Sequence, residues 1–267
     1  MTASHKGIAV VTGASSGIGA IYADRLARRG YDLILVARSQ KKLGEVAERV
    51  SRATGRSVAT VPADLNHKPD LKRVETLLSS DAGITMLVNN AGVGAVAPLL
   101  ESDVDDMEVM IELNVTALTR LTYAVVPGFV ARGGGTIINI SSAVAVGPEI
   151  LNGVYGGTKA FVLALSLSLY KELADKVRVQ AVLPGATATG FWSAAGGSLD
   201  KLPGEMVMRA DDLVDAALAG FDQGELVTIP SLPNGADWDA YEAARQKLLP
   251  NLSLSLPPVR YRPAAAA

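Results

Sequence analysis

The sequence contains no cysteine and only two histidines among its 267 residues. Without cysteine, the chain has no disulfide framework, no thiolate nucleophile and no cysteine metal site. His5 and His67 stand in polar surroundings far apart in the chain, which is typical of surface histidines, so we expect no metal site. Catalysis by a serine–histidine pair or by a metal ion is therefore disfavoured.

A strong charge of one sign and long apolar runs are also lacking. The formal net charge is −2, so we expect no basic surface for nucleic acid or for an anionic membrane. No run approaches the ~20 apolar residues of a membrane span. The first six residues show no apolar segment of the kind found in a secretory signal. We therefore expect a cytoplasmic protein without nucleic-acid or membrane partners.

What the sequence does contain is a regular alternation of short apolar runs and amphipathic helical patterns. Hydrophobic residues make up 49% of the chain and charged residues 19%, a balance typical of a globular protein with a sizeable core. Strands are expected at 8–11, 31–37, 57–62, 84–88, 136–140, 177–183 and 225–229. Helices are expected at about 21–29, 40–53, 70–80, 107–130, 161–174, 211–221 and 236–249.

The alternation predicts an α/β fold of the Rossmann type, with a doubly wound parallel sheet of seven strands and helices on both faces. No Pro/Gly/Ser linker is long enough to separate domains. We therefore expect one domain over residues 1–267.

A glycine-rich turn follows the first expected strand. It reads Thr12-Gly13-Ala14-Ser15-Ser16-Gly17-Ile18-Gly19 and leads into an amphipathic helix. Gly13 lets the chain turn sharply, Gly17 leaves room for a phosphate at the helix start, and Gly19 lets the helix pack closely on the strand. The arrangement predicts a site for a dinucleotide pyrophosphate, although a tight turn needs glycine even where nothing binds.

The second strand ends at Ala37 and is followed by Arg38 and Ser39. In a dinucleotide fold, an acidic residue here would bind the ribose 2′-hydroxyl and repel a 2′-phosphate. This chain has no such acid, whereas the guanidinium of Arg38 and the hydroxyl of Ser39 can bind a phosphate. We expect NADP(H) in preference to NAD(H), which stays possible; a solvated arginine at a strand end is the alternative reading of Arg38.

The spacing of the glycines resembles that of the short-chain dehydrogenase/reductase family, and further motifs follow in the order of that family over about residues 7 to 230. They are Asn89-Asn90-Ala91-Gly92, the pair Ser142 and Tyr155 thirteen residues apart, the pattern Tyr155-x-x-x-Lys159, and Pro184-Gly185-x-Thr187-x-Thr189. The resemblance places Asn90, Ala91 and Gly92 close to the cofactor. It places Thr187 and Thr189, after Pro184 and Gly185, near the nicotinamide carboxamide and the phosphate.

The resemblance implies hydride exchange between a nicotinamide and a carbonyl or alcohol carbon. Tyr155 would pass the proton, and Lys159 would bind the nicotinamide ribose and lower the pKa of Tyr155 from the same helix face. Ser142 would polarise the substrate oxygen, and Asn114, at a family position in an irregular helix turn, would complete a water relay. Asp64 and Leu65 would lie beside the adenine, although Asp64 could equally cap its own turn.

The substrate is expected to be a mainly apolar ketone, aldehyde or secondary alcohol. A glycine-containing stretch with many apolar side chains, about residues 190–209, predicts a substrate lid. Apolar residues are also expected near the mouth of the site, namely Val93, Val96, Val144, Val146 and Leu151. The chain departs from the family at Gly156-Gly157, where small residues other than glycine are usual. These glycines either loosen the active-site face or make room for substrate.

Two alternatives stay open at this point. One is an NAD-dependent alcohol dehydrogenase of the same family, and the other is a dinucleotide-binding sensor or scaffold, which would not need Tyr155 and Lys159. An epimerase of the family's extended branch would need a larger substrate domain than residues 186–267 provide. The resemblance also implies a homodimer or homotetramer, formed through the helices of Asn114 and Tyr155. Beyond the last helix a tail follows, and we expect disorder from Arg262 onward.

Overall fold

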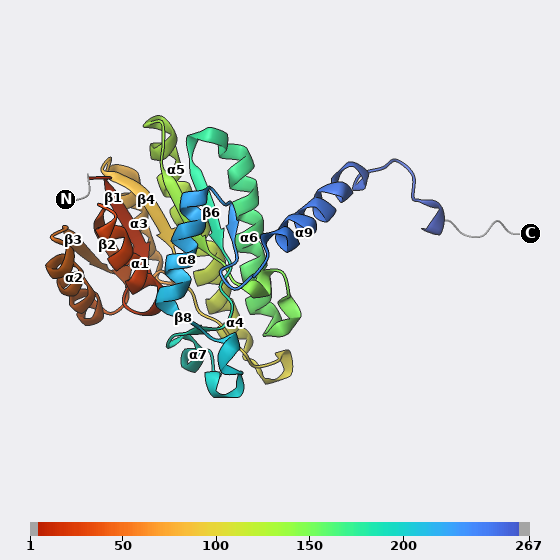
Figure 1. Ribbon diagram of the computed structural model, residues 1–267, viewed down its shortest axis with the longest axis horizontal. Coiled ribbons are helices and arrows are strands. Elements are labelled where there is room, and N and C mark those ends of the chain that lie inside the picture. Colours follow the sequence, from red (N-terminus) through yellow and green to blue (C-terminus); the bar gives the residue numbers. More distant parts are fainter. Residues whose placement is uncertain (1–4, 262–267) are drawn as a thin grey trace, which may run out of the picture. The chain divides into compact units, whose positions relative to one another are not determined.

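Seven parallel strands form the central sheet of the structure, a computed structural model that describes residues 5–261. Their spatial order is β3-β2-β1-β4-β5-β6-β9, so the direction of winding reverses between β1 and β4 (Figure 1). The strands are β1 (Ile8–Thr12), β2 (Asp32–Ala37), β3 (Val58–Pro62), β4 (Ile84–Asn89), β5 (Thr136–Ile140), β6 (Arg178–Val182) and β9 (Val227–Thr228). The predicted doubly wound α/β fold is confirmed, with a last strand shorter than expected.

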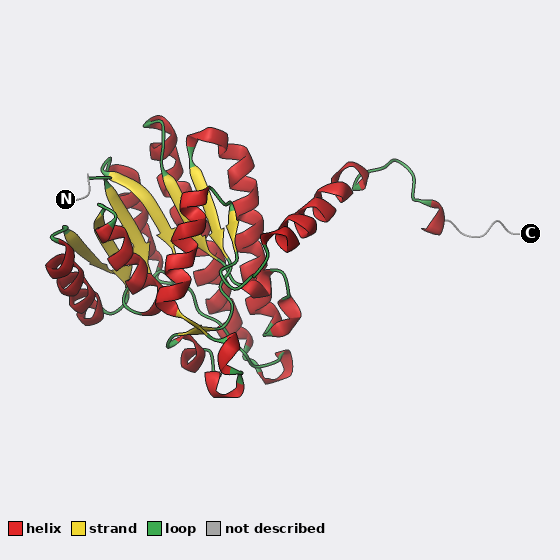
Figure 2. Ribbon diagram, in the orientation of Figure 1, coloured by secondary structure: helices red, strands yellow, loops and turns green. Residues whose placement is uncertain are grey.

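Helices cover both faces of this sheet (Figure 2). One face carries α1 (Gly17–Arg28), α2 (Gln40–Thr54) and α8 (Ala210–Gln223), and the other carries α3 (Lys68–Ser80), α5 (Leu118–Ala131) and α6 (Gly153–Leu173). Because all strands are parallel, their carboxyl ends lie at one edge of the sheet. The glycine turn, the asparagine motif and the Pro184–Thr189 motif follow strands β1, β4 and β6 at this edge, whereas Tyr155 and Lys159 lie in α6.

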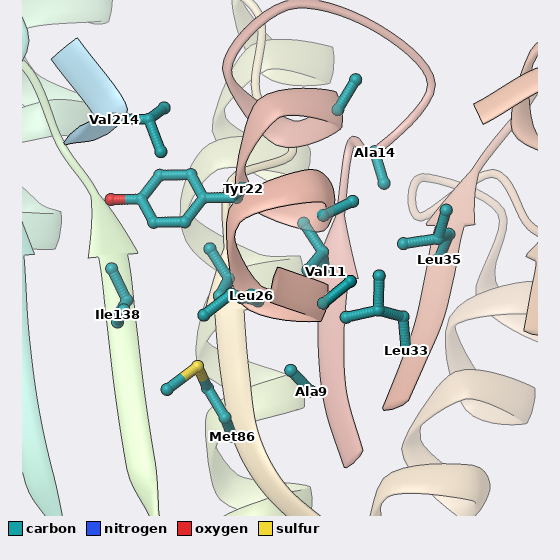
Figure 3. Close-up of a cluster of buried hydrophobic side chains, with 14 of the residues drawn as sticks. Ala9, Val11, Ala14, Tyr22, Leu26, Leu33, Leu35, Met86, Ile138 and Val214 are labelled. Atoms are coloured by element: carbon teal, nitrogen blue, oxygen red, sulfur yellow. The ribbon is translucent and has the colours of Figure 1, made fainter. Parts of the chain in front are cut away.

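The apolar face of α1 packs on the apolar strands of the sheet and forms one half of the core. Tyr22 and Leu26 of α1 lie over side chains of β1, β4 and β5, and Tyr22 also approaches Val214 of α8 (Figure 3). Both α1 residues are at most 1% exposed. Burial of each such side chain contributes about 1.5–3 kcal/mol, so this face of α1 holds the glycine turn against the strand that precedes it.

The long helix expected over 107–130 is interrupted. It consists of α4 (Val104–Ile111), a π-helical segment η2 (Glu112–Ala117) and α5, which continue one another over 28 residues. In contrast to the sequence expectation, this run is long and apolar enough to cross a membrane, by length and composition alone. Its residues Leu121, Val125 and Phe129 are buried against the sheet, as in the core helix of a globular protein.

The stretch expected to form a lid contains short elements. They are α7 (Phe191–Ala194), two 3-10 turns at Leu199–Lys201 and Gly204–Met206, and β8 (Met208–Arg209), which pairs with β7 (Thr187–Ala188). Trp192 Nε1 donates a hydrogen bond to the carbonyl of Thr187 at 3.1 Å. The stretch is therefore folded back onto the loop that follows β6.

The chain divides into two units, residues 1–231 and residues 232–267. The second contains α9 (Gly235–Leu248), close to the helix expected at 236–249, and none of its residues is buried. The single domain predicted over 1–267 stays a prediction. Residues 1–4 and 262–267 lie outside the described residues, and so does the disorder expected from Arg262 onward.

Candidate active site

The glycine turn has the conformation and the electrostatics of an anion site. Gly13 and Gly17 have φ values of +65° and +53°, which favour glycine. Ser16 precedes α1 without a side-chain capping bond, and the first turn of α1 carries no acidic residue. The N–H groups at the start of α1 therefore stay available, and the positive end of the helix dipole is not neutralised. Ser15 and Ile18 lie in this turn, and both are half-buried.

Close packing explains the third glycine and the asparagine motif. A Cβ at Gly19 would lie 2.5 Å from the carbonyl oxygen of Gly13 and from Asn90 Nδ2. Asn90 Nδ2 donates to the carbonyl of Thr12 at 2.8 Å, and Thr12 Oγ1 accepts the N–H groups of Asn90 and Ala91 at 3.0 and 2.9 Å. Thr12 and Asn90 thus join the ends of β1 and β4, which holds the glycine turn beside Ala91 and Gly92.

Four predicted cofactor residues lie in the loops after β2 and β3, and they differ in how far their side chains are already engaged by other residues. Arg38 is exposed and has no hydrogen bond or ion pair with any residue that the structure describes. Ser39 caps α2, its hydroxyl accepting the N–H of Lys42 at 3.3 Å. Asp64 Oδ1 accepts the N–H of Asn66 at 3.0 Å, so the turn-capping reading of Asp64 is correct. Leu65 is buried in the core, which leaves only its backbone for an adenine.

The loop after β6 faces the glycine turn. A Cβ built at Gly17 would lie 3.4 Å from Thr189 Cγ2, in ordinary van der Waals contact. Thr189 Oγ1 accepts the N–H of Phe191 at 3.3 Å, and Thr187 Oγ1 donates to the carbonyl of Gly185 at 3.0 Å. The predicted phosphate-binding residues of two distant motifs are therefore brought together across the edge of the sheet.

Ser142 and Tyr155 meet in a buried environment. Both are less than 10% exposed. Burial raises the pKa of the Tyr155 phenol above its ordinary value, and a hydrogen bond with Ser142 offsets part of that rise. The Ser142 hydroxyl also lies 3.4 Å from the carbonyl of Pro184, to which it donates. The phenol is therefore protonated at neutral pH and can act as a proton donor.

Lys159 lies one helical turn beyond Tyr155 on α6. Its ammonium is 5.9 Å from the centre of the Tyr155 ring and donates to the carbonyl of Ile140 at 3.0 Å. Burial lowers the pKa of Lys159 to about 8. Burial of the phenol is the largest influence on its pKa, and the lowering of the Tyr155 pKa by Lys159 stays a prediction.

Asn114 lies in the π-helical segment η2, and its side chain holds the site together. Its Oδ1 accepts the N–H of Val93 at 3.0 Å, and its Nδ2 donates to the carbonyl of Val93 at 2.8 Å and to Thr158 Oγ1 at 3.0 Å. A Cβ at Gly92 would lie 3.0 Å from Asn114 Oδ1 and 3.4 Å from Lys159 Nζ. The irregular turn predicted here is confirmed, whereas the water relay stays a prediction.

Sequence reasoning missed Asn152, a buried residue that caps the start of α6. Its Oδ1 accepts the N–H groups of Val154 and Tyr155 at 2.9 and 3.3 Å, and its Nδ2 donates to the carbonyl of Ala97 at 2.7 Å. Asparagine is among the preferred residues at helix N-termini. An Asn-Gly pair just before the tyrosine was the signal that could have revealed this role.

The two glycines after Tyr155 have separate explanations. A Cβ at Gly156 would lie 2.9 Å from Cα of Pro148, whereas a Cβ at Gly157 would meet nothing within 4 Å. Gly156 is therefore required by the close approach of Pro148. The space around Gly157 would accept a larger side chain.

This difference predicts opposite effects of two neighbouring substitutions. Gly157→Ala should raise the free energy of unfolding by about 1 kcal/mol, because alanine costs less conformational entropy in a helix. Gly156→Ala should lower it, since the methyl group would displace the backbone at Pro148. Urea unfolding of both variants checks this prediction, and equal shifts would contradict it.

An apolar cluster surrounds Tyr155. The side chains that contribute to it are those of Val93, Ala95, Met107, Met110, Val144, Leu151, Val154 and Phe191. Three of the five residues expected near the mouth, Val93, Val144 and Leu151, belong to it. Val146 is 41% exposed and does not belong to the cluster. The predicted proton donor is thus enclosed by apolar groups, which suit an apolar substrate better than a charged one.

The sequence pattern of the short chain dehydrogenase family matches residues 7–197. The chain belongs to this family. The match covers the glycine turn, the asparagine motif and the Tyr155–Lys159 helix, and it ends shortly after the loop that follows β6. The motifs on which the resemblance rested therefore lie within the part that matches, while the roles of the individual residues stay predictions.

Two solved structures are similar to this short-chain dehydrogenase over nearly its whole length. A short-chain dehydrogenase from Sphingobium yanoikuyae in complex with NADPH is 48% identical, with a TM-score of 0.93, and covers 96% of this chain and 100% of its own. The bulky-bulky ketone specific alcohol dehydrogenase from Comamonas testosteroni is 42% identical, with a TM-score of 0.89, covering 97% and 100%.

A curated relative is longer. The very-long-chain 3-oxoacyl-CoA reductase of Anas platyrhynchos is 36% identical over 208 residues, which cover 76% of this chain and 66% of the relative. This chain is thus an oxidoreductase of the short-chain dehydrogenase family with both reductases and dehydrogenases among its relatives.

Proposed function

We propose that this enzyme uses NADP(H) to reduce mainly apolar ketones and aldehydes, and oxidises the corresponding alcohols, secondary alcohols in the case of ketones, in reverse. The observation that carries the proposal is the buried Ser142–Tyr155 pair inside an apolar cluster, with Lys159 one helical turn away. The NADPH complex of the Sphingobium relative and the ketone specificity of the Comamonas relative support the cofactor and the substrate class.

The residues at the edge of the sheet fit such a cofactor. The uncapped start of α1 and the hydroxyl of Thr189, which lies across from Gly17, would hold the pyrophosphate. Arg38, free of other partners among the described residues, would bind a 2′-phosphate. When bound, the nicotinamide supplies the hydride.

The chain's own groups supply the proton chemistry. The Ser142 hydroxyl donates a hydrogen bond to the carbonyl oxygen of the substrate, and Tyr155 gives its proton to that oxygen as negative charge develops. Lys159, oriented by the carbonyl of Ile140, has further N–H groups for a ribose hydroxyl. Apolar neighbours keep water from the phenol.

Nucleotide titration of the wild type and of Arg38→Ala tests the cofactor assignment. Loss of a charge-assisted bond costs about 1.5–3 kcal/mol, so NADPH should bind roughly 10- to 100-fold more weakly to the variant. NADH affinity should change little, because NADH has no 2′-phosphate. Nucleotide fluorescence gives both dissociation constants.

Lys41→Ala is the matched control, since Lys41 is an exposed cation three residues further along the chain. It should leave the NADPH preference unchanged. Equal binding of NADPH and NADH by the wild type would contradict the proposal and favour the NAD-dependent alternative. Failure to bind either nucleotide would favour the sensor or scaffold class with another ligand.

The pKa of Lys159 predicts a pH dependence. Its side chain is an ammonium below pH 8 and an amine above it, because burial lowers its pKa to about 8. The kcat/KM for NADPH, which reports on the free enzyme, should therefore be level below that pH and fall by about tenfold per pH unit above it. Lys159→Arg stays charged throughout this range, so its profile should lack this fall. A level wild-type profile up to pH 10 would contradict the assignment.

We also propose that copies of the chain associate through α5 and α6, as the family resemblance implies. Tyr123 on α5 is 71% exposed and Phe161 on α6 is 37% exposed. Helix α6 is apolar around its whole circumference, a pattern typical of a helix covered on all sides. Light scattering should give a mass of two or four chains, and the mass of one chain would contradict the proposal.

A further inference from the structure

The helix α7 carries an aromatic side chain against the predicted proton donor. The ring centres of Phe191 and Tyr155 are 5.7 Å apart, with the rings tilted by 42°. The Phe191 N–H donates to Thr189 Oγ1, and the Trp192 ring meets the Phe191 ring edge-on at 6.0 Å. The backbone of Phe191 is therefore held by Thr189, and its ring is held by the ring of Trp192.

Gly94 provides the space that this ring occupies. A Cβ at Gly94 would lie 2.3 Å from Cζ of Phe191 and 3.2 Å from Cε2 of Tyr155. The φ of Gly94 is not in the left-handed region, so its backbone would accept alanine and only the lack of space opposes it. The segment around Gly94 is itself anchored, because Val96 donates its N–H to the carbonyl of Ala195 at 3.2 Å.

We propose that Gly94 and Phe191 form a size filter that sets the room for one of the two substituents of the reacting carbonyl. This inference rests on the proposed ketone reduction. Ser142 and Tyr155 hold the carbonyl oxygen, so the two substituents must extend in different directions from the phenol. The Phe191 ring occupies the space beside Tyr155 on one of these sides. A larger substituent on that side collides with the Phe191 ring. The same constraint favours hydride transfer to one face of the carbonyl.

The filter can be measured with aryl ketones whose alkyl group grows from methyl in acetophenone to propyl in butyrophenone. Phe191→Ala should raise the kcat/KM of butyrophenone relative to acetophenone by about tenfold or more, since butyrophenone carries two additional methylenes and one methylene in a pocket changes kcat/KM by roughly 10- to 200-fold. Gly94→Ala, which pushes the ring toward the substrate, should lower this ratio by a similar factor. Both variants should also change the ratio of alcohol enantiomers.

The double variant tests whether the two residues act through one contact. Without the ring, the two shortest contacts of the added methyl at Gly94 are gone, and the next is with Tyr155 Cε2 at 3.2 Å. The double variant should therefore behave as Phe191→Ala does, and the two single effects should fail to add. Additive effects would overturn the proposal that Gly94 acts by making room for Phe191.

Two further variants are controls that distinguish loss of the Phe191 ring from a general disturbance of α7. Ser193→Ala changes an exposed residue of the same helix and should leave both ratios as in the wild type. Phe191→Leu keeps an apolar side chain and should give intermediate ratios. If the wild type reduces the ketones and Phe191→Ala leaves both ratios unchanged, the size filter is overturned and the proposed function is not. A wild type that binds NADPH but reduces neither ketone would overturn the proposed function together with the filter.

Discussion

Replacing Tyr155 by phenylalanine should lower kcat for ketone reduction by about 10³-fold. General acid catalysis contributes roughly 10²- to 10⁴-fold, and the variant loses the phenolic O–H that is assigned as the proton donor. The ring itself is kept, so its contacts with Phe191 and with Lys159 should persist. NADPH affinity should therefore stay within about threefold of the wild type. Steady-state rates and nucleotide titration on the same preparation check this prediction.

Ser142→Ala is the comparison for this experiment, because it removes the hydrogen-bond partner of the phenol and keeps the phenol. It should lower kcat less than Tyr155→Phe and should raise the pKa of Tyr155, since Ser142 is the group that lowers it. A Tyr155→Phe variant with more than a tenth of the wild-type rate would contradict the assignment of Tyr155 as the proton donor.

Replacing Asn114 by alanine should be the most damaging single change to the stability of the site. Asn114 is 1% exposed and makes three hydrogen bonds, two of them with the backbone of Val93. Each buried group left without a partner costs about 1–3 kcal/mol, so the free energy of unfolding should fall by roughly 3 kcal/mol. In a domain of this size, that corresponds to a fall in Tm of roughly 6–12 °C.

Asn66→Ala is the matched control, because the Asn66 amide makes one hydrogen bond, to the carbonyl of Val109 at 3.2 Å. Its cost should be about 1 kcal/mol. Differential scanning calorimetry gives both values. The kcat of Asn114→Ala at a temperature where it is folded should also be lower, because the Gly92–Val93 backbone would no longer be held beside Lys159. Equal costs for both asparagines would contradict the role assigned to Asn114.

Much of the fold and of the site could be predicted because the relevant signals are local. Strands are short runs of apolar residues and helices repeat every three to four residues, so the winding of the sheet followed from their order. The glycine turn has the conformation that its glycines suggested, and Ser142 meets Tyr155 as the motifs implied. Asp64 shows the limit of such signals, because the structure confirms its turn cap and leaves the adenine contact as a prediction.

The parts that escaped prediction depend on residues far apart in the chain. Asn152 caps the helix of Tyr155 and also binds the carbonyl of Ala97, more than fifty residues earlier. Gly156 is a glycine because Pro148 lies against it, and no spacing in the sequence announces that contact. The partners of Asn114 likewise could not be predicted, because Val93 and Thr158 hold its amide from two other segments.

The sequence by itself determined the α/β architecture, the family and the chemical groups of the site, because these depend on periodicity and on motifs read along the chain. Only the tertiary structure decided the protonation of those groups and the shape of their surroundings. Burial raises the pKa of Tyr155 and lowers that of Lys159, and burial arises where several loops meet at the edge of the sheet. The placement of Phe191 against Tyr155 in the space left by Gly94 arises in the same way, since each contact joins segments that folding alone brings together.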